Sequence, residues 1–341
     1  MSSLIVVHPT FDAVWPFAAD HLGALWQKQG PLRFIRLQHG DDQPLHELVL
    51  DLATVERLIS LNVRVTPETI QRMPMLREAA ILREYGANED PELKAVLAAH
   101  GVRTYAHRSE GFWGQSVAEF ALALTLCALR RIPQTYAEMM RSHDVWNYQP
   151  PGGRGAPGQR GHQYGDDARF ANGVVAGKRV RIVGAGNIGS RYASFVKMLG
   201  ADVAAWDPYA SEPCFHRSGA RRVFYLDQLL HDAEIFAPML PLTDGTRGLI
   251  TREHIYSLPR GCLIVLVTRA AICDMAAIRA RVLNDEVALA ADVFDVEPLP
   301  LDDPLLGRHN VVHTPHNAGR TRHANEQWAQ MLADQFLPVS S

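Results

Sequence analysis

The sequence predicts an α/β protein with two doubly wound parallel sheets. Three observations lead to this fold class. Apolar strand segments alternate with helical patterns along most of the chain, which is typical of parallel sheets covered by helices on both faces. The 341 residues are enough for two domains. A glycine-rich turn directly follows a strand at residue 184, as it does in nucleotide-binding folds.

The first part of the chain is predicted to be a small α/β unit. Its expected elements are a strand at 4–8, a helix at 17–29, a strand at 32–37, and short helices alternating with strands, among them 63–65 and 80–82. Residues 116–131, SVAEFALALTLCALRR, are apolar on nearly every face. We therefore expect a helix that is buried all round, between domains or between subunits.

Residues 150–161, PPGGRGAPGQRG, separate the two parts and cannot form a packed core. They are predicted to be a surface connection, with a loop over an active site or an RGG-like nucleic-acid segment as alternatives. The chain beyond them has a more regular pattern. Its predicted strands are 178–184, 202–206, 234–239, 262–267, 287–291 and 310–313, and its predicted helices are 187–199, 226–231, 251–257 and 274–283.

A dinucleotide fingerprint stands at the start of this second part. The strand 178–184 runs into GAGNIG at 184–189, and a helix follows. Gly184 makes the tight turn, Gly186 lets the backbone approach a pyrophosphate, and Gly189 lets the helix pack close to the strand. The helix start offers backbone N–H groups and the positive end of its dipole to the phosphates. This context predicts a Rossmann domain that binds a dinucleotide.

The next strand of this domain ends in Asp207, 23 residues after Gly184. A carboxylate at this place accepts hydrogen bonds from the adenine ribose hydroxyls and repels a 2′-phosphate. No arginine occupies the next two positions, Pro208 and Tyr209. NAD is therefore expected in preference to NADP.

Composition excludes several classes of partner. The chain carries 34 basic and 37 acidic residues, a net charge of −3, so positive charge does not supply affinity for nucleic acid or a membrane surface. No stretch approaches the roughly 18 uninterrupted apolar residues of a membrane span, and the N-terminus lacks the basic region of a signal peptide. We expect a cytoplasmic protein with no nucleic-acid and no membrane partner.

Three polar residues follow strands of the predicted Rossmann sheet, at the edge where open α/β sheets bind ligands. Arg269 follows the strand 262–267 and can bind a carboxylate through two parallel N–H bonds. Glu297 comes after the strand 287–291, and His316 comes after the last strand. Each has an ordinary alternative as a surface side chain. Together, behind a dinucleotide fingerprint, they indicate a catalytic site.

These motifs resemble the D-isomer-specific 2-hydroxyacid dehydrogenases, which include glycerate, glyoxylate/hydroxypyruvate, D-lactate and phosphoglycerate dehydrogenases. The resemblance covers roughly residues 80–330. It is carried by REYGAN at 83–88, VAE at 117–119, GAGNIG at 184–189, LPLTDGT at 240–246, TR at 268–269, DVF at 292–294 with EP at 297–298, and TPH at 314–316. It implies an NAD-dependent enzyme that interconverts a 2-oxo acid and a D-2-hydroxy acid.

The resemblance also implies roles for single residues. Arg269 would bind the substrate carboxylate, Glu297 would orient the histidine, and His316 would be the general acid and base. Asp292 is expected at the nicotinamide carboxamide, and no metal is needed. The backbone expected at the substrate is that of Gly86, Ala87 and Asn88. The expected cofactor residues are Gly184, Gly186, Asn187, Ile188, Gly189, Asp207, Pro241, Thr246, Thr268, Asp292 and Gly319.

The chemistry of these roles is hydride transfer between NADH and C2 of the 2-oxo acid, during which the carbonyl oxygen gains negative charge. Arg269 would fix the carboxylate and polarise the neighbouring carbonyl. Protonated His316 would deliver a proton to that oxygen, and the neutral ring would remove it in the reverse direction. A hydrogen bond from the other ring nitrogen to Glu297 would orient the imidazole and favour its protonated form.

Several segments depart from the family pattern. LVTRA at 266–270 lacks the polar residue and the glycine that usually flank the arginine, and Glu84 stands where the substrate loop usually has a glycine. A carboxylate there opposes an anionic substrate unless it points away or pairs with Arg83. These departures suggest a specialised substrate whose extra polar or anionic groups would meet Arg83, Arg108 or the arginines of 150–161.

The resemblance implies a discontinuous arrangement of domains. Residues 1–108 and 315–341 would form a flavodoxin-like substrate-binding domain, and residues 109–314 would form the NAD-binding domain. A homodimer through the cofactor domains is expected, which suits the apolar helix at 116–131. Phe112 and Trp113, just before that helix, are predicted to pack between domains or else to form a wall of the substrate pocket.

Two other functions remain as alternatives. A family relative can oxidise another small anion, as the formate and phosphite dehydrogenases do, although Arg269, Glu297 and His316 together favour hydroxyacid chemistry. The same fold also serves as a dinucleotide-sensing corepressor. The absence of long low-complexity tails argues against that function, as does the cost of keeping an unused charged triad.

Overall fold

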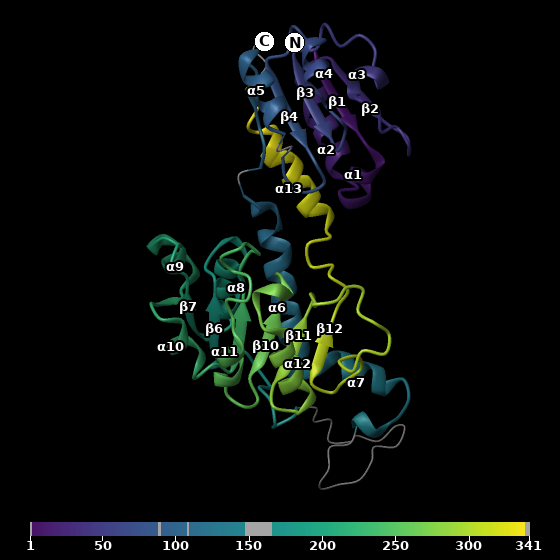
Figure 1. Ribbon diagram of the computed structural model, residues 1–341. Coiled ribbons are helices and arrows are strands. Elements are labelled where there is room, and N and C mark those ends of the chain that lie inside the picture. The colour runs from purple at the N-terminus through teal and green to yellow at the C-terminus, as the bar shows by residue number, and fades with distance from the viewer. Residues whose placement is uncertain (1, 88–89, 108, 147–165, 338–341) are drawn as a thin grey trace. The chain divides into compact units, whose positions relative to one another are not determined.

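The computed structural model describes residues 2–87, 90–107, 109–146 and 166–337, and it divides into two units (Figure 1). Unit 1 comprises Met1–Phe112 and Thr321–Ser341, and unit 2 comprises Trp113–Arg320. The predicted boundaries lie a few residues earlier at both crossings, so His316 belongs to unit 2 and not to the predicted substrate-binding domain. The segment 150–161, Asn88 and Arg108 lie outside the described residues.

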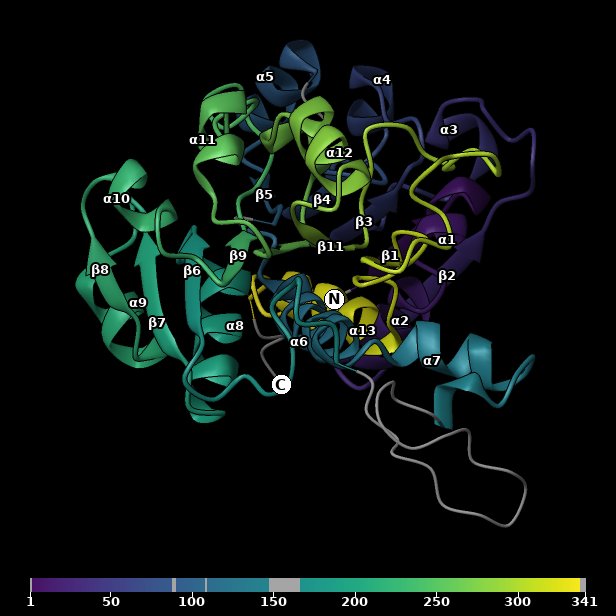
Figure 2. The same ribbon diagram turned by 90° about the horizontal axis from the view of Figure 1, so that it is seen from below.

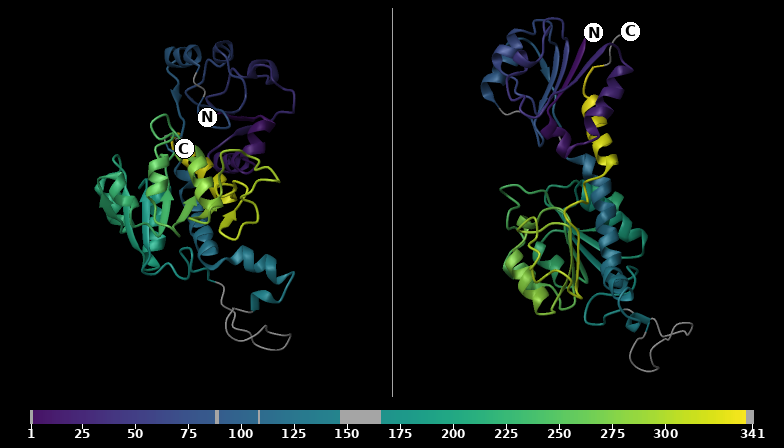
Figure 3. Two further views of the ribbon diagram at one scale, coloured as in Figure 1. Left: turned by 60° about the horizontal axis from the view of Figure 1, so that its bottom comes forward. Right: turned by 90° about the vertical axis from the view of Figure 1, so that its right-hand side faces the viewer.

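Unit 1 is built on a five-stranded parallel sheet. Its elements are β1 (Ser3–Val7), α1 (Pro9–Val14), α2 (Ala18–Gln27), β2 (Leu32–Arg36), α3 (Leu45–Leu48), β3 (Arg57–Leu61), α4 (Pro67–Gln71), β4 (Glu78–Leu82), α5 (Pro91–Ala99), β5 (Arg103–Thr104) and α13 (Arg322–Ala333). The strand order is β2-β1-β3-β4-β5, which is the flavodoxin-like order. The C-terminal helix α13 packs on α2, as the right-hand view of Figure 3 shows.

The central strands of unit 1 are buried along their whole length, including two charged residues. Arg57 begins β3 and Glu78 begins β4, each side chain is 1% exposed, and Arg57 Nε lies 3.5 Å from Glu78 Oε2. The sequence prediction of a strand at 63–65 is wrong, because β3 ends at Leu61. The charge of Arg57 at the start of β3 hides the apolar pattern of this strand. A charge at that buried position is tolerated only because Glu78 lies beside it.

Unit 2 contains a seven-stranded parallel sheet. It begins with a 3₁₀ turn (Gly111–Trp113) that crosses from unit 1. Its elements are α6 (Gly114–Arg130), α7 (Ile132–Met139), a 3₁₀ turn (Asp144–Trp146), β6 (Arg179–Val183), α8 (Asn187–Met198), β7 (Asp202–Trp206), α9 (Glu212–Ser218), β8 (Arg221–Val223), α10 (Leu226–Leu230), β9 (Ile235–Pro238), α11 (Arg252–Ser257), β10 (Leu263–Leu266), a 3₁₀ turn (Ala270–Ile272), α12 (Met275–Leu283), β11 (Ala288–Ala291) and β12 (Val311–His313).

The sheet of unit 2 has the order β12-β11-β10-β9-β6-β7-β8, with every pairing parallel. Helices α6 and α8 cover one face, and α11 and α12 lie on the other (Figure 2). Each face has its own apolar core. The predicted strands agree with the structure to within about a residue at each end, whereas α9 and β8 were not predicted.

Helix α6 is buried on one side only. It packs against α8 and the strands β10 to β12, while Glu119, Ala123, Leu126 and Arg130 are exposed. Within the single chain the sheet and α8 cover only one side of the helix, so the predicted burial between subunits stays a prediction. The stretch Gly111–Arg130 is long and apolar enough to span a membrane by length and composition alone, a test that core helices of soluble proteins also pass.

Candidate active site

The glycine-rich turn lies between β6 and α8, and each glycine has a steric reason. Gly184 has a φ of +97°, and a Cβ there would lie 2.7 Å from the carbonyl oxygen of Met239. A Cβ on Gly189 would collide with the carbonyl oxygen of Gly184. A Cβ on Gly186 would meet nothing within 4 Å, and this residue caps α8 without a side-chain hydrogen bond. The start of α8 is therefore open to an anion.

The carboxylate of Asp207 holds this turn in place. Its Oδ2 accepts a hydrogen bond from Ala185 N at 2.8 Å, and its Oδ1 accepts bonds from Tyr209 N and Ala210 N, each at 2.9 Å. A carboxylate has about four acceptor positions, so capacity remains for a hydroxyl donor. Asp207 thus fixes the loop shape and keeps a negative charge beside the glycine turn.

Two further predicted cofactor residues brace neighbouring strand ends. The hydroxyl of Thr246 donates to Pro241 O at 2.6 Å and closes the loop after β9. Thr268 follows β10, is buried, and donates to Pro238 O at 3.2 Å. Thr246 thus holds the loop after β9, and Thr268 ties the end of β10 to the end of β9. Of the remaining predicted cofactor residues, Asn187 and Ile188 form the first turn of α8.

The three predicted catalytic residues follow three neighbouring strands, β10, β11 and β12. His316 Nδ1 lies 2.7 Å from Glu297 Oε2, and Glu297 Oε1 accepts a bond from Phe294 N at 2.8 Å. The side chain of His316 is 44% exposed, so the ring is held through Nδ1 while the rest of it remains accessible. Arg269 is half-buried, with Nη1 donating to Thr268 O at 2.8 Å. The structure therefore joins Glu297 to His316 directly and places Arg269 at the same sheet edge.

The loop that carries His316 is organised by a buried carboxylate. Asp292 is 0% exposed. Its Oδ1 accepts bonds from Thr314 Oγ1 at 2.6 Å and from Asn317 N at 3.1 Å, and its Oδ2 accepts a bond from Ala318 N at 2.9 Å. Both oxygens are thus occupied by the loop. In this structure Asp292 positions the His316 loop, and its expected contact with a nicotinamide carboxamide stays a prediction.

Trp113 packs beside the predicted carboxylate-binding arginine. The Arg269 guanidinium carbon lies 5.9 Å from the centroid of the Trp113 ring, within the range of a cation–π contact. Gly319, three residues beyond His316, lies against the same ring, and a Cβ there would come 3.1 Å from Cδ1 of Trp113. The ring also packs against the core of unit 2. Trp113 therefore touches both the arginine and the histidine loop.

A second histidine, His313, precedes the catalytic candidate on β12. Burial lowers the pKa of His313, and the negative charge of Asp303 opposes this effect only in part. Its ring therefore favours the neutral form and is a poor proton donor at neutral pH. Among the described residues, no group of three His, Cys, Asp or Glu side chains is arranged to hold a metal ion.

The predicted substrate loop lies in unit 1, after β4. Gly86 has a φ of +86°, its carbonyl oxygen accepts a bond from Arg83 N at 3.0 Å, and Ala87 bridges to Leu82. The loop is thus a tight turn at the carboxyl edge of that sheet. Asn88, the third predicted residue, lies outside the described part of the chain.

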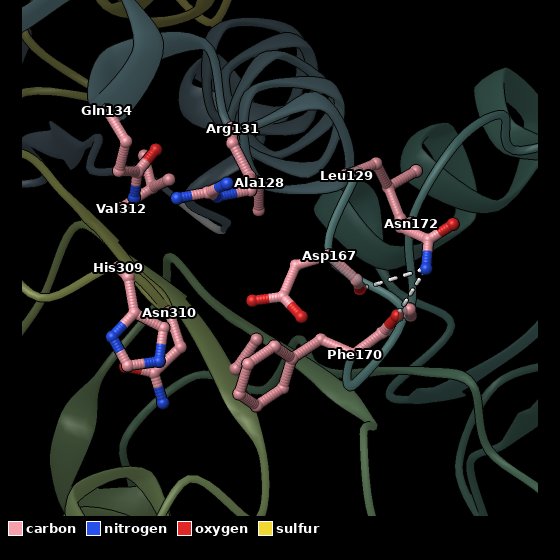
Figure 4. Close-up of a pocket in the computed structure, with 12 residues that line it drawn as sticks. Ala128, Leu129, Arg131, Gln134, Asp167, Phe170, Asn172, His309, Asn310 and Val312 are labelled. Atoms are coloured by element: carbon pink, nitrogen blue, oxygen red, sulfur yellow. Dashed lines mark hydrogen bonds between the residues drawn. The ribbon is translucent and has the colours of Figure 1, made fainter. Parts of the chain in front are cut away.

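A pocket in unit 2 lies away from these residues. It has a volume of about 330 Å³, including the open solvent at its mouth, and its lining includes Arg131, Asp167, Phe170, His309 and Asn310 (Figure 4). His309 and Asn310 precede β12, whereas His316 follows it. The pocket therefore lies at the opposite edge of the sheet and is not part of the candidate active site.

Fold and site together define a class: a two-unit α/β protein whose larger unit is a Rossmann fold with an arginine and a glutamate–histidine pair at its carboxyl edge. The NAD-binding-domain model of the D-isomer specific 2-hydroxyacid dehydrogenases matches residues 122–318. The chain belongs to this family, which confirms the resemblance seen in the sequence, and unit 2 contains the family's NAD-binding domain.

Individual relatives share part of their length with this chain. The D-3-phosphoglycerate dehydrogenase of Mycobacterium tuberculosis is 34% identical over 288 residues, which is 83% of this chain and 49% of the relative. That of Methanocaldococcus jannaschii is 30% identical over 225 residues, 66% of this chain and 39% of the relative. The glyoxylate reductase of Korarchaeum cryptofilum is 26% identical over 276 residues, 80% of this chain and 76% of the relative. The chain thus spans half or less of the length of these phosphoglycerate relatives.

Solved structures share the fold. A D-lactate dehydrogenase from Treponema pallidum has a TM-score of 0.65 at 20% identity and covers 98% of this chain and 95% of its own. The D-lactate dehydrogenase of Escherichia coli has a TM-score of 0.60 at 19% identity, with the same coverage. These similarities confirm the predicted fold of two parallel-sheet α/β domains.

Sequence reasoning missed some residues that organise the two carboxyl edges. Thr314 was recognised only as part of a motif, although its hydroxyl bonds Asp292. His8 and Asn62 were not singled out at all. The sequence pattern places His8 inside the predicted strand 4–8, although β1 ends at Val7, and it predicts a strand at 63–65, after Asn62, although β3 ends at Leu61. Correct strand ends are the signal that would have found both.

Proposed function

We propose that this protein catalyses the NAD-dependent interconversion of a 2-oxo acid and a D-2-hydroxy acid. The observation that carries the proposal is the 2.7 Å contact between His316 Nδ1 and Glu297 Oε2, at the sheet edge that also bears Arg269 and the glycine turn. Family membership supports the same chemistry. The names of the relatives leave the substrate open among small hydroxy and oxo acids.

The residues of unit 2 divide the work of this reaction. Arg269 binds the substrate carboxylate and draws electron density from the adjacent carbonyl. Glu297 accepts the bond from Nδ1 of His316 and stabilises the imidazolium, which leaves Nε2 to give a proton to the carbonyl oxygen. In the oxidative direction the neutral ring takes that proton back. Asp292 holds the loop of His316 through its three bonds.

The glycine turn is the part of this chain that fits a dinucleotide. Nothing crowds the Cβ position of Gly186, and the start of α8 has no side-chain cap. Bound NAD(H) would supply the hydride acceptor or donor. Asp207 supports a preference for NAD over NADP, because its fixed carboxylate repels a 2′-phosphate. When Asp207 is replaced with Ser, the ratio of kcat/KM for NADH to kcat/KM for NADPH is expected to fall by at least about tenfold.

A homodimer built on the cofactor domains belongs to this proposal. The exposed side of α6 includes Leu126, and α7 has no buried residue and exposes Ile132, Tyr136 and Met139. Large exposed apolar side chains on two successive helices favour an interface. Light scattering is expected to give twice the chain mass, and Leu126→Glu is expected to shift the protein toward monomer. A cytoplasmic location is proposed with it, to be checked by cell fractionation.

The decisive experiment measures NADH consumption with a panel of 2-oxo acids. Reduction of at least one of them, with formation of the D-hydroxy acid, supports the proposal. Formate or phosphite oxidation without 2-oxo acid reduction would favour the alternative enzyme class. NADH binding without turnover on any of these substrates would favour a sensing role.

A further inference from the structure

The residue that holds the catalytic histidine stands on a long loop of unit 2. The β11–β12 loop comprises residues 292–310, all of them described, and contains no helix or strand. Within it, Glu297 accepts a bond from Phe294 N through Oε1 and contacts His316 Nδ1 through Oε2. The first bond is local to the loop and does not connect it to another element. The position of Glu297 relative to His316 therefore depends on how the loop is fixed to the rest of unit 2.

An arginine of α12 binds this loop on both sides of Glu297. Arg279 Nε and Nη2 donate to Asp295 Oδ1 at 3.2 and 2.8 Å, and Nη1 donates to Asp303 Oδ2 at 2.9 Å and to Oδ1 at 3.1 Å. Asp295 stands two residues before Glu297, and Asp303 stands six residues after it. We call Arg279, Asp295 and Asp303 the Arg279 clamp. Because the guanidinium is planar and all three of its nitrogens are used, it fixes two points of the loop at once.

The clamp is largely shielded from water. The side chains of Arg279 and Asp303 are 19% and 8% exposed, so each charge depends on the other for its stabilisation. Burial raises the pKa of Asp295, but the bonds from Arg279 outweigh this effect and leave that pKa lowered. Asp295 therefore stays ionised at neutral pH and keeps its contact with the guanidinium.

The sequence of the loop shows why it needs a cation from another element. Residues 292–303 include five acidic side chains and no lysine or arginine. Like charges in one short segment repel each other. Arg279 offsets two of these charges on either side of Glu297. Within the part of the chain that the structure describes, Arg279 forms no hydrogen bond with Glu297 or His316, so it can act on them only through the loop.

We propose that Arg279 is a positioning residue for the proton transfer: through Asp295 and Asp303 it holds Glu297 where its carboxylate binds His316. The inference rests on the proposed function and adds a residue to its machinery. Arg279 acts through Glu297 and is not itself catalytic. A displacement of Glu297 by about 1 Å would break the 2.7 Å contact with His316, and misplacements of this size reduce turnover by up to about 10²-fold.

The first test separates turnover from binding. Arg279→Met removes the guanidinium and is expected to lower kcat at least about tenfold. KM for the 2-oxo acid and the Kd of NADH should stay within about twofold, because Arg269 and the glycine turn are unchanged. Asp295→Asn removes one half of the clamp at a partly exposed site, so it tests the proposal even if Arg279→Met fails to fold, and it should lower kcat about threefold. Wild-type kcat in a folded clamp variant would overturn the proposal.

The matched control is Arg281→Met, in the same helix. Arg281 is buried, and it bonds Glu286 Oε2 at 3.0 Å and the carbonyl oxygens of Ile255 and Leu258, none of which belongs to the β11–β12 loop. This variant should lower stability in urea and leave the kcat of the folded protein unchanged. An equal loss of kcat in Arg281→Met and Arg279→Met would reduce Arg279 to a general structural role and overturn the proposal.

A double-mutant cycle tests whether Arg279 acts through Glu297. Glu297→Ala removes the group that the clamp positions. Adding Arg279→Met to Glu297→Ala is therefore expected to lower kcat by less than about twofold further. If the losses of the two single variants instead multiply in the double variant, Arg279 does not act through Glu297 and the proposal fails.

A spectroscopic measurement separates this inference from the proposed function, because it needs no turnover. The nitrogen chemical shift of His316 Nδ1, measured by NMR on histidine-labelled protein, reports whether this nitrogen carries the proton that Glu297 accepts. Arg279→Met is expected to move this shift toward its value in Glu297→Ala, and Arg281→Met should leave it as in the wild type. If no 2-oxo acid is reduced but the shift moves in this way, the proposed function fails and the clamp retains its positioning role. If turnover is found and Arg279→Met leaves the shift unchanged, the proposed function stands and this inference fails.

Discussion

The carboxyl edges of the two sheets follow the same topological rule but carry different sets of polar side chains. In unit 2 the edge presents Arg269, the open start of α8 and a histidine held by a carboxylate, which together suit an anion and a proton transfer. In unit 1 the corresponding edge presents Glu84, which accepts a bond from Asn62, together with Arg36 at the end of β2 and Arg83 after β4. The topology therefore gives the position of a site, and the side chains after each strand give its chemistry.

The units also differ in how they hold buried polar groups. Asp292 in unit 2 is fully buried and accepts three hydrogen bonds. His107 in unit 1 packs between Phe112 and Trp328, with ring centroids 5.1 and 4.6 Å away, and within the described residues neither ring nitrogen has a hydrogen-bond partner. The first arrangement stabilises a charge, and the second penalises one.

The largest effect is expected from removing the proposed proton donor at the unit 2 edge. His316→Ala removes the proposed proton donor, so turnover should fall by roughly 10²–10⁴-fold while NADH affinity is retained. Stopped-flow turnover and fluorescence titration of NADH measure the two quantities. His323→Ala, at an exposed histidine of α13, is the control. Wild-type turnover in His316→Ala would remove this residue from the mechanism.

The next effect tests the support beneath that edge. Asp292→Asn replaces one acceptor oxygen with a donor that faces the N–H and O–H groups of the His316 loop, so one or more buried bonds are lost. The free energy of unfolding should fall by about 2–3 kcal/mol, and turnover should fall about tenfold or more. Urea unfolding and steady-state kinetics measure both, with Asp302→Asn at an exposed site as control. Unchanged stability would show that the loop does not depend on Asp292.

A third prediction concerns the unpaired histidine of unit 1. Burial lowers the pKa of His107 from 6.5 to about 4, so the unfolded chain takes up a proton at a higher pH than the folded one. The contribution of the neutral ring to stability is fully present above pH 6.5 and is lost as pH falls toward 4, by up to about 1.4 kcal/mol per pH unit. His107→Leu should flatten the pH dependence of urea unfolding over that window.

The control for this prediction is His39→Leu, at an exposed histidine of the same unit. It should leave the slope of stability against pH as in the wild type. If the slope of stability against pH were the same in His107→Leu as in the wild type, the protonated ring of His107 would have an ionic or hydrogen-bond partner in the folded protein in solution.

The smallest effect probes the packing beside Arg269. In Gly319→Ala the new methyl group would lie 3.1 Å from Cδ1 of Trp113, so the ring must shift by a few tenths of an ångström. KM for the 2-oxo acid should rise two- to threefold, which corresponds to a loss of less than about 1 kcal/mol in substrate binding. NADH affinity should be unchanged. Adding Trp113→Phe should relieve the contact and recover part of the loss. No change in KM would mean that Trp113 does not position the arginine.

Much of the fold could be predicted because its signals are local. Side-chain periodicity predicts strand β7. The steric needs of single residues predict the glycine turn after β6. The strand β3 could not be placed, because its first residue is a charged Arg57 that only Glu78, on another strand, makes tolerable in the core. The apolar composition of α6 likewise does not say what covers each side of the helix; within the chain, the sheet and α8 cover one side.

The sequence by itself determined the fold class, the family and the identity of Arg269, Glu297 and His316 as the candidate catalytic residues, because strand ends and short motifs are written in neighbouring residues. The tertiary structure alone decided which side chains meet. It joined His316 to Glu297, turned Asp292 toward the histidine loop, and brought Glu84 to Asn62. Hydrogen bonds between residues far apart in the chain depend on strand order and loop geometry, and no local pattern encodes these.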